Sequence, residues 1–252
     1  MSELILERIS DHLDRLKLYT AKEILGQVTE KAKAEQLSYL CYLDQLLEEE
    51  VNAREDRRVR TALKIGGLPF EKTLEDYDFG FHPNLDKRQV LNLFDLDFMK
   101  GHSNVIFLGP PGVGKTHLAT ALAIKACYAG ASIYFTTMAD LIVKLRKDDE
   151  ANRKGRGRSY YKSSLVVVDE VGYTPLNREE GHLFFQFVSN RYERASTIIT
   201  SNKSFTEWGH LFGDPVIVTA ILDRLLHHCV VLNMKGKSYR LRNYEEKKEQ
   251  MS

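Results

Sequence analysis

Gly109-Pro110-Pro111-Gly112-Val113-Gly114-Lys115-Thr116 is the stretch that decides the fold of this chain. It follows the short apolar run Val105 to Leu108 and opens a helical segment from Thr116 to Ala129. Between a strand and a helix, the spacing Gly-x4-Gly-Lys-Thr is typical of a P-loop, whose backbone N–H groups curl around phosphate oxygens. The positive end of the following helix also faces the phosphates. The stretch therefore predicts a nucleotide-binding α/β domain.

The side chains of the loop indicate which nucleotide species binds. Lys115 places a mobile positive charge against the β and γ phosphates, and Thr116 offers a hydroxyl to Mg²⁺, which prefers oxygen ligands. We therefore expect ATP and Mg²⁺ as cofactors. The predicted nucleotide-binding residues are Gly109, Pro110, Pro111, Gly112, Val113, Gly114, Lys115, Thr116 and His117.

Two further strand ends supply the groups that hydrolysis requires. The apolar run Leu165 to Val168 ends in Asp169 and Glu170, about fifty residues after the loop, as a Walker B element does. We expect Asp169 to hold the magnesium ion with Thr116, and Glu170 to orient and polarise the attacking water. Asn202 follows the next apolar strand, at the sensor 1 position, where its amide can hydrogen-bond the water or the γ-phosphate.

Positive charge must also be supplied as the phosphoryl group is transferred, and an arginine finger is worth about 10³ to 10⁵ in rate. Arg224 is the first candidate for a finger that acts across a subunit interface, and Arg240 is the candidate for a sensor 2 contact within the same subunit. Arg191 and Arg194 end a helix that begins near Asn177, where cations complement the helix dipole, so we expect a structural role for both.

The remainder of the chain indicates two domains. Apolar runs of strand length alternate with amphipathic stretches, which is typical of a parallel sheet flanked by helices. Residues 3 to about 64 are expected to be helical, with a break near Gly26, and Gly66, Gly67 and Pro69 then interrupt the pattern. We predict a small all-helical N-terminal domain over residues 1–70 and an ATPase domain over residues 71–252. The five predicted strands lie at Val105–Leu108, Ser132–Phe135, Leu165–Val168, Thr197–Thr200 and Cys229–Leu232.

Apolar stripes mark the predicted core of the helical domain. Leu6, Ile9, Leu13 and Leu16 form one stripe at helical spacing, and the leucine-rich run from Leu40 to Val51 forms another. Both are expected to be buried. His227 and His228 are expected to be interface or surface residues rather than metal ligands, because no partner stands at ligand spacing.

Composition narrows the functional classes. The 36 basic and 35 acidic residues leave a net charge of +1, so any nucleic-acid site must be a local basic patch. Three widely spaced cysteines argue against disulfides or a zinc cluster, and no run of 18 apolar residues or signal sequence is present. We expect a soluble protein of a reducing cytoplasm that is not attached to a membrane.

Taken with these motifs, the chain closely resembles the IstB-like helper ATPases of bacterial insertion sequences, relatives of the DnaC and DnaA branch of AAA+ proteins. The resemblance rests on TLEDYDF, GPPGVGKTHLATALA and VVVDEVGYTPLNREEGHLFFQFVSNRYERASTIITSN, and on FTEWGHLFGDPVIVTAILDRLLHH and GKSYRLR. It implies a P-loop AAA+ core around the parallel five-stranded sheet. It also implies that Arg224 is the box VII finger and Arg240 is sensor 2. The chain departs from general AAA+ design in one respect, since only about twenty residues follow the fifth predicted strand, and we therefore expect a reduced C-terminal lid.

The resemblance further implies an ATP-dependent homo-oligomer that assembles on duplex DNA, remodels it, and recruits and stimulates an IstA-type transposase. Two local patches carry the basic residues that such binding requires, and Tyr160 and Tyr161 could pack on the sugar backbone. Without a base-reading element, binding is expected to be largely independent of sequence. The predicted DNA contacts are Arg54, Arg57, Arg58, Lys144, Arg146, Lys147, Arg153, Lys154, Arg156 and Arg158.

Other functions share these motifs. A DnaC-like replicative helicase loader has the same nucleotide site, although some loaders carry an N-terminal cysteine-rich module that is absent here, since only Cys41 lies in that region. A nucleotide-gated scaffold that does not hydrolyse ATP is a second alternative, against which Glu170 and Asn202 argue. A small-molecule kinase is a third, for which no acceptor site is evident.

Overall fold

The computed structural model describes residues 2–70, 72–151, 158–239 and 241. The chain divides into two compact units, Met1–Thr61 and Ala62–Ser252, and the division falls within a helix, α3. No helix of the described residues is both long and apolar enough to cross a membrane.

The first unit consists of α1 (Ser2–Arg15), α2 (Tyr19–Ala34) and the greater part of α3 (Tyr39–Gly66). The chain breaks its helices at Lys17 and Gln36, which both have positive φ, at 57° and 52°. The predicted break near Gly26 was therefore wrong. Helix α2 runs through Gly26 because Ala21 and Leu25 anchor it to the core, which outweighs the cost of about 1 kcal/mol for a glycine within a helix.

The core of this unit is smaller than the apolar stripes predict. Its buried members are Leu13, Ala21, Leu25 and Leu46. A unit of only three helices encloses little volume, so most stripe residues stay at the surface. The predicted burial was wrong for Leu6, Leu16, Leu40, Leu43, Leu47 and Val51, of which Leu40 is 80% exposed.

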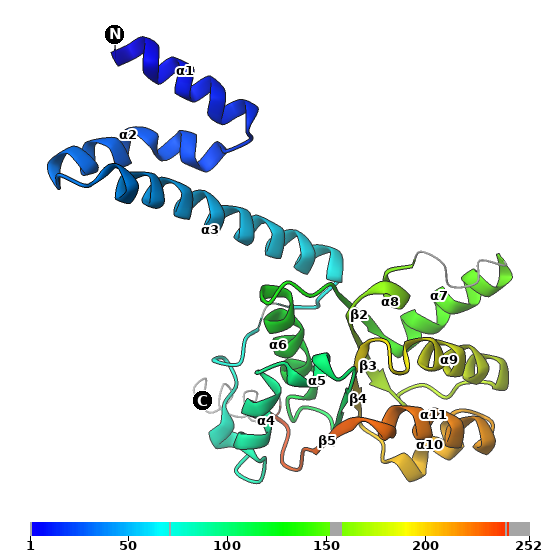
Figure 1. Ribbon diagram of the computed structural model, residues 1–252. Helices are drawn as coiled ribbons and strands as arrows, with labels where there is room; N and C mark the ends of the chain where they lie inside the picture. Colours follow the sequence, from blue (N-terminus) through cyan, green and yellow to red (C-terminus); the bar gives the residue numbers. More distant parts are fainter. Residues whose placement is uncertain (1, 71, 152–157, 240, 242–252) are drawn as a thin grey trace, which may run out of the picture. The chain divides into compact units, whose positions relative to one another are not determined.

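The second unit is built on one parallel sheet (Figure 1). Its order, β2-β3-β4-β1-β5, places β1 between β4 and β5, and β4 between β1 and β3. All five predicted strands are present, and the predicted fold class is confirmed. Their bounds are Asn104–Leu108 (β1), Ile133–Thr137 (β2), Leu165–Val171 (β3), Ser196–Ser201 (β4) and Cys229–Asn233 (β5).

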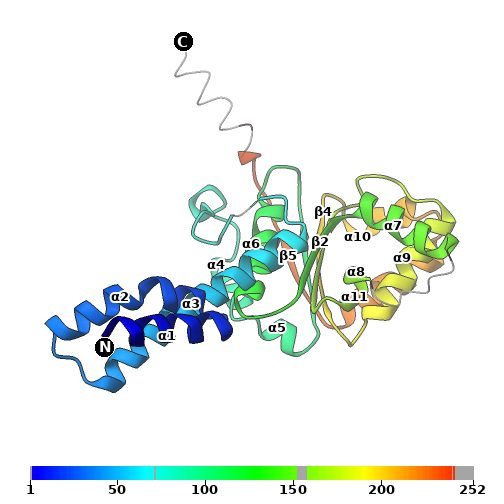
Figure 2. The same cartoon turned by 90° about the horizontal axis from the view of Figure 1, so that it is seen from above.

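Helices cover both faces of the sheet, as Figure 2 shows. One face carries α6 (Lys115–Tyr128), with α4 (Lys87–Leu93) and α5 (Asp97–Lys100) on the same side. The short 3-10 helix η1 (Phe79–Phe81) precedes α4 in the chain. On the other side lie α7 (Met138–Glu150), α8 (Ser159–Lys162), α9 (Arg178–Arg191), α10 (Phe205–Leu211) and α11 (Pro215–His227). Because all strands run the same way, the segments that follow them meet at one edge of the sheet.

Local signals fix the starts of the helices that flank the site. Asn177 and Glu180 form a capping box at the start of α9, in which each side chain accepts the other residue's backbone N–H. Asp214 caps α11 through the N–H of Val216, and Pro215 occupies the first turn. These caps fix the first residues of α9 and α11, the helices that carry Arg191 and Arg224.

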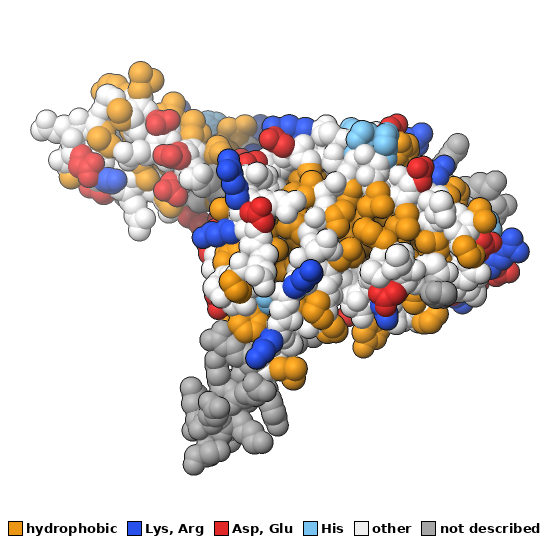
Figure 3. Space-filling view, turned by 90° about the horizontal axis from the view of Figure 1, so that it is seen from below, with side chains coloured by type: hydrophobic (Ala, Val, Ile, Leu, Met, Phe, Trp, Pro, Cys, Tyr) orange, Lys and Arg blue, Asp and Glu red, His pale blue; other side chains and the backbone are white. Residues whose placement is uncertain are grey.

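Strand β5 forms one edge of the sheet and is only partly covered. Cys229, Val230 and Val231 are half-buried, and Leu226 at the end of α11 is exposed. In the view from below (Figure 3), hydrophobic side chains gather across the middle of this unit. The second unit therefore presents apolar surface in addition to its closed core.

Candidate functional site

The loop after β1 has the backbone that phosphate binding requires. Gly112 and Gly114 have φ of 82° and 89°, and a Cβ on Gly112 would lie 2.0 Å from Ser238 Oγ, so neither position accepts a larger residue. Gly114 caps the N-terminus of α6, whose first residue is Lys115. Lys115 Nζ donates to the carbonyl oxygens of Gly109 and Pro110, both at 2.8 Å. The lysine thus lies across the loop, beside the space that phosphates would fill.

The two residues predicted to hold magnesium are in contact. Thr116 Oγ1 lies 2.9 Å from Asp169 Oδ1 and 3.2 Å from Oδ2, although 53 residues separate them. Asp169 is 6% exposed. A hydroxyl and a carboxylate at this spacing are the oxygen donors that Mg²⁺ prefers, so the residues present fit the ion.

Thr200 also belongs to this site, and the sequence reasoning missed it. Its hydroxyl donates to Asp169 Oδ1 and accepts the backbone N–H of Glu170 at 3.1 Å. The signal available in the sequence was a hydroxyl two residues before Asn202, at the end of a strand next to the one that carries Asp169. Thr200 therefore links the Asp169 carboxylate to the Glu170 backbone.

Glu170 occupies an irregular point of the sheet. The pairing of β3 with β4 shifts between Val168 and Val171, and Glu170 has a φ of 61°. The turn leaves its side chain exposed, and it lines a cavity with Tyr173 and Glu180, whereas Lys115 lines a different cavity. The structure therefore brings Lys115, Thr116 and Asp169 together and leaves Glu170 on the adjoining side of the strand end.

Asn202 follows β4 with its amide oxygen buried. This Oδ1 atom has no hydrogen-bond partner among the described residues. A buried acceptor without a donor is costly, typically by about 1 to 3 kcal/mol, so a donor from a bound ligand or a water molecule would stabilise it. The neighbouring Ser201 hydroxyl donates to the carbonyl oxygen of Val171 at 2.6 Å and so ties this strand end to β3.

A cavity of about 230 Å³ opens beside the loop. Besides Lys115 and Thr116, its walls include the aromatic side chains of Tyr77, His82 and Tyr239. Tyr77 donates to the carbonyl oxygen of Val113, and burial raises the pKa of its hydroxyl above the ordinary value. Flat aromatic walls next to a phosphate loop suit a nucleobase. His117, predicted as a nucleotide contact, lines the same cavity.

His82 is a second residue that the sequence reasoning missed. It is 4% exposed, and burial lowers the pKa of its imidazole, which favours the neutral form. Its Nδ1 atom has no hydrogen-bond partner among the described residues. The segment TLEDYDF held the only available signal, since it leads into η1 and His82.

The candidate finger arginine lies away from this chain's own loop. Arg224, on α11, is stacked over the Phe185 ring at 4.7 Å and donates to the carbonyl oxygen of Ala220 at 3.1 Å. It does not line the cavity beside Lys115. Arg240, the predicted sensor 2, lies outside the described residues.

Most of the described arginines predicted to contact DNA make contacts within the chain. On the ATPase unit, Arg146 pairs with Glu180, and Arg158 pairs with Asp148 at 2.7 Å. Lys144 lies over the Tyr134 ring at 5.3 Å, whereas Lys147 is exposed. Arg153, Lys154 and Arg156 lie outside the described residues.

The prediction that Tyr160 packs on the sugar backbone of DNA was wrong. Tyr160 was expected to reach the sugar backbone from a loop, but α8 buries it to 4% exposure and its hydroxyl bonds Asp148. The aromatic contacts of Tyr160 with Tyr134 and Tyr161 explain the burial. Tyr160 is a core residue.

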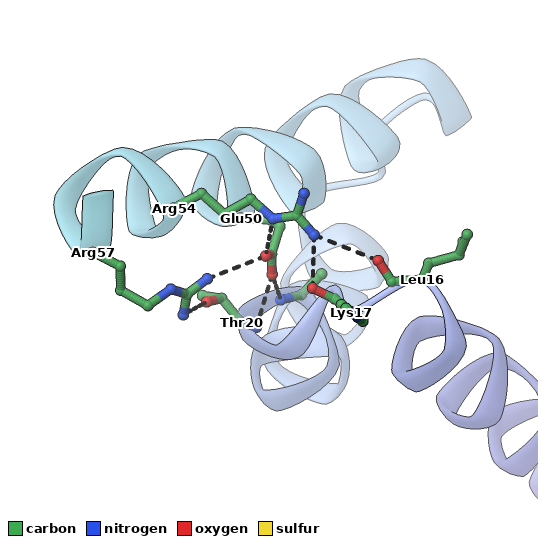
Figure 4. Close-up of polar contacts among 7 residues, drawn as sticks. Leu16, Lys17, Thr20, Glu50, Arg54 and Arg57 are labelled. Atoms are coloured by element: carbon green, nitrogen blue, oxygen red, sulfur yellow. Dashed lines mark hydrogen bonds and ion pairs between the residues drawn. The ribbon is translucent and has the colours of Figure 1, made fainter. Parts of the chain in front are cut away.

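In the first unit, Arg54 and Arg57 converge on Glu50, as Figure 4 shows. Glu50 is 2% exposed and also accepts the backbone N–H groups of Thr20 and Ala21 at the start of α2. Arg54 additionally donates to the carbonyl oxygen of Lys17. This cluster joins α2 to α3, while Arg58 is exposed.

The predicted structural role of Arg191 is confirmed, by a different mechanism from the helix dipole. It is 2% exposed and donates to the carbonyl oxygens of Ser163 and Ser196 and to the Thr197 hydroxyl. His227 and His228 are exposed, as predicted, but the expectation that no further ligand stands near them was wrong, because each lies 3.9 Å from Glu193 Oε1.

Comparisons with known proteins agree on one family. The family model described as IstB-like ATP binding protein matches residues 11–247. The ATP-binding protein of insertion sequence IS21 from Pseudomonas aeruginosa is 46% identical over 231 residues, 91% of this chain and 87% of that protein. The counterpart from IS5376 of Geobacillus stearothermophilus is 42% identical over 237 residues, 94% of each chain.

Among solved structures, the crystal structure of the DnaC helicase loader superposes with a TM-score of 0.52 and 26% identity. The match covers 65% of this chain and 96% of that one. The likeness agrees with a P-loop AAA+ core.

Proposed function

Because the chain belongs to the family of IstB-like ATP-binding proteins of insertion sequences, we propose that it is an AAA+ ATPase that acts on DNA in transposition. It binds ATP with Mg²⁺, assembles as a homo-oligomer on duplex DNA largely independently of sequence, remodels that DNA, and recruits and stimulates an IstA-type transposase. Its place is the bacterial cytoplasm, on DNA. The single observation that carries the catalytic part is the contact of Thr116 with Asp169 beside Lys115.

In this proposal the loop holds the nucleotide. The backbone N–H groups from Gly112 to Thr116 would surround the β-phosphate, and Lys115 would exchange its two carbonyl acceptors for phosphate oxygens. The base enters the cavity bordered by Tyr77, His82 and Tyr239. His117 supports the same wall, through its ring nitrogen against the Thr73 carbonyl at 2.8 Å.

Thr116 and Asp169 would hold Mg²⁺, which neutralises charge on the phosphates when bound. Glu170 accepts a proton from the attacking water, and Asn202 orients this water through the buried amide oxygen that has no protein donor. Thr200 holds the Asp169 carboxylate and the Glu170 backbone in place through its hydroxyl.

The finger and sensor assignments make hydrolysis depend on assembly. Arg224 is stacked on Phe185 and does not line its own chain's nucleotide cavity, which supports a role at a neighbouring subunit's γ-phosphate. We assign Arg240 to the nucleotide of its own subunit. The apolar surface along β5 and the exposed run of Leu40, Leu43 and Leu47 on α3 support contacts between subunits.

We assign oligomerisation and DNA contact to residues 1–70, and ATP hydrolysis to residues 71–252, which also carry the second patch of predicted DNA contacts. Among the predicted DNA contacts, the exposed Arg58 and Lys147 have no ion-pair partner among the described residues and are the strongest candidates. Arg54, Arg57, Arg146 and Arg158 would have to exchange their present carboxylate partners for phosphates.

Sedimentation of the full chain with duplex DNA of unrelated sequences tests the proposal, with ATP, ADP or no nucleotide. We expect large complexes with ATP only, no complexes for Lys115→Ala, and persistent complexes for Glu170→Gln, which binds ATP without hydrolysing it. Added transposase should then be captured by the ATP-bound complexes and stimulated by them.

One other function is favoured by a specific observation, namely the likeness to the DnaC helicase loader. If no nucleotide state binds duplex DNA while ATP still binds to wild type and not to Lys115→Ala, the transposition proposal fails. Delivery of a helicase then becomes the better assignment.

A further inference from the structure

A second cavity lies at the amino ends of the strands, on the side of the sheet opposite to the nucleotide site. It has a volume of about 250 Å³ and is lined by Ser164, which precedes β3, and by Ala195, which precedes β4. The phosphate loop follows the carboxyl end of β1. Because all strands are parallel, the amino ends of β3 and β4 and the carboxyl end of β1 lie at opposite edges. This amino-edge cavity is therefore separate from the ATP site.

The inner wall of the amino-edge cavity contains a buried positive charge. Arg191 lines it and is 2% exposed. Its hydrogen bonds go to the carbonyl oxygens of Tyr160, Ser163 and Ser196 and to the Thr197 hydroxyl. These four bonds use four of the five N–H groups of a guanidinium and supply no negative charge.

No carboxylate among the described residues lines this cavity. The nearest acid in sequence, Glu193, lies 3.9 Å from His227 and His228 instead. Burial lowers the pKa of Arg191 to about 10, so the guanidinium remains protonated at neutral pH. A buried cation that is balanced only by neutral dipoles is stabilised by an anion that approaches it.

The rim adds charge of the same sign. Lys162 and Arg194 line the cavity, are exposed, and form no ion pair with a described residue. Asn190, Ser164 and His102 add neutral hydrogen-bonding groups around them. Three cations and several neutral groups around about 250 Å³ match a tetrahedral oxyanion with its waters, each of which occupies about 30 Å³.

We propose that the amino-edge cavity binds a phosphate group, with Arg191 at its inner wall and Lys162 and Arg194 at its rim. This inference rests on the DNA-binding function proposed above, because the phosphate group is one of the backbone of duplex DNA. Because the contacts read charge and not bases, this site adds affinity without sequence preference. It also leaves the ATP site free.

The first experiment measures the thermal unfolding of the full chain in inorganic phosphate and in chloride of equal ionic strength. Lys162→Gln/Arg194→Gln is compared with wild type and with Lys125→Gln. Lys125 is the matched control for Lys162, because both are exposed lysines in the last turn of a helix. Phosphate should raise the Tm of wild type and the control by about 2–4 °C more than that of the double variant.

The second experiment measures the affinity for duplex DNA between 50 and 200 mM salt, in the presence of ATP. For the double variant we expect about tenfold weaker binding at the lowest salt and a salt slope smaller by about one, the value for one lost phosphate contact. Lys125→Gln should keep the wild-type slope. ATP binding should be the same in all three proteins.

The outcomes separate the site from its source. If the phosphate effect and the DNA slope are both unchanged in the double variant, the site is disproved. If only the phosphate effect is lost, the cavity takes free phosphate and the DNA source is overturned. If wild type binds no DNA but shows the phosphate effect, the proposed function fails and the phosphate site stands.

Discussion

Two buried carboxylates, one in each unit, have opposite surroundings. Glu50 accepts from two backbone N–H groups and pairs with two guanidiniums, Arg54 and Arg57. Asp169 accepts hydrogen bonds from the hydroxyls of Thr116 and Thr200. Glu50 is saturated with charged and backbone donors that belong to the fold. Asp169 is held by hydroxyls, which a divalent cation can join or displace.

The difference shows how to distinguish a structural charge from a reactive one. A carboxylate whose acceptor sites are filled by strong donors stabilises the fold and is unavailable for ligands. A carboxylate held by neutral hydroxyls keeps affinity for a cation, at the cost of weaker support from its surroundings. Exchange of each carboxylate for an amide should therefore affect different properties of the protein.

The largest effect is expected for Asp169→Asn. The amide removes the charge that would hold Mg²⁺, and loss of several kcal/mol of charge stabilisation corresponds to a decrease of about 10³-fold in kcat. The free energy of unfolding should change by less than about 1 kcal/mol, since an amide oxygen can still accept from Thr116 and Thr200. Steady-state ATP hydrolysis and urea unfolding of the full chain measure both quantities. A variant whose free energy of unfolding falls while its kcat stays at the wild-type value would contradict the assignment.

Glu50→Gln should show the reverse pattern. Removal of the charge weakens the bonds from Arg54, Arg57 and the Thr20 and Ala21 amides, which we expect to cost about 2 kcal/mol locally. The site-specific measurement is hydrogen exchange at the Thr20 and Ala21 amides, which should be about thirtyfold faster. ATP hydrolysis without DNA should stay at the wild-type rate. Unchanged exchange would show that the cluster does not hold α2 to α3.

Thr200→Val tests the hydroxyl that the nucleotide site shares between Asp169 and Glu170. Valine keeps the shape and removes a donor and an acceptor, so the Glu170 N–H is left without its partner. We expect kcat for ATP hydrolysis to fall about tenfold, equivalent to about 1.4 kcal/mol, with little change in KM. Thr200→Ser should restore most of kcat. A change confined to KM would place Thr200 in binding rather than in positioning.

The pH dependence of stability separates the same two regions by a smaller effect. Burial by itself raises the pKa of Glu50, but bonds from Ala21, Arg54 and Thr20 outweigh it and hold the pKa below its usual value of 4.5. A lowered pKa in the folded state contributes stability above the unfolded pKa, and this contribution disappears as the pH falls. The difference in unfolding free energy between wild type and Glu50→Gln should therefore be constant near pH 6 and shrink below about pH 4.5. A difference that grows on acidification would contradict the cluster's role.

Motif spacing predicted which residues of the candidate nucleotide site lie close together, because their positions are fixed by the order of strands in a parallel sheet. The glycines, Lys115, Thr116 and Asp169 lie where the pattern of apolar runs puts them. Thr200 and His82 escaped prediction because their roles arise from register between strands and from packing of a loop, which no short pattern encodes.

The number of charged residues in a segment predicted the DNA contacts less well than motif spacing predicted the arrangement of the nucleotide site. Arg54, Arg57, Arg146 and Arg158 have the composition of a DNA surface, yet each faces a carboxylate supplied by a turn of the same helix or by a different segment. The apolar stripe on α3 misled in the same way, because a helical period shows that a face exists and not what covers it. In both cases the missing information was the tertiary partner.

The smallest effects are expected from a pair of arginines on α3, Arg54→Gln and Arg58→Gln. Arg54 pairs with buried Glu50 and donates to the Lys17 carbonyl, so its loss should cost about 1 kcal/mol of local stability. Arg58 is exposed and should cost less than about 0.5 kcal/mol. For DNA binding the order should reverse, because only Arg58 presents a charge free of a described carboxylate, and its removal should lower the salt slope by about one. If the two variants changed stability equally and DNA affinity equally, the ion pair with Glu50 would not distinguish Arg54 from Arg58.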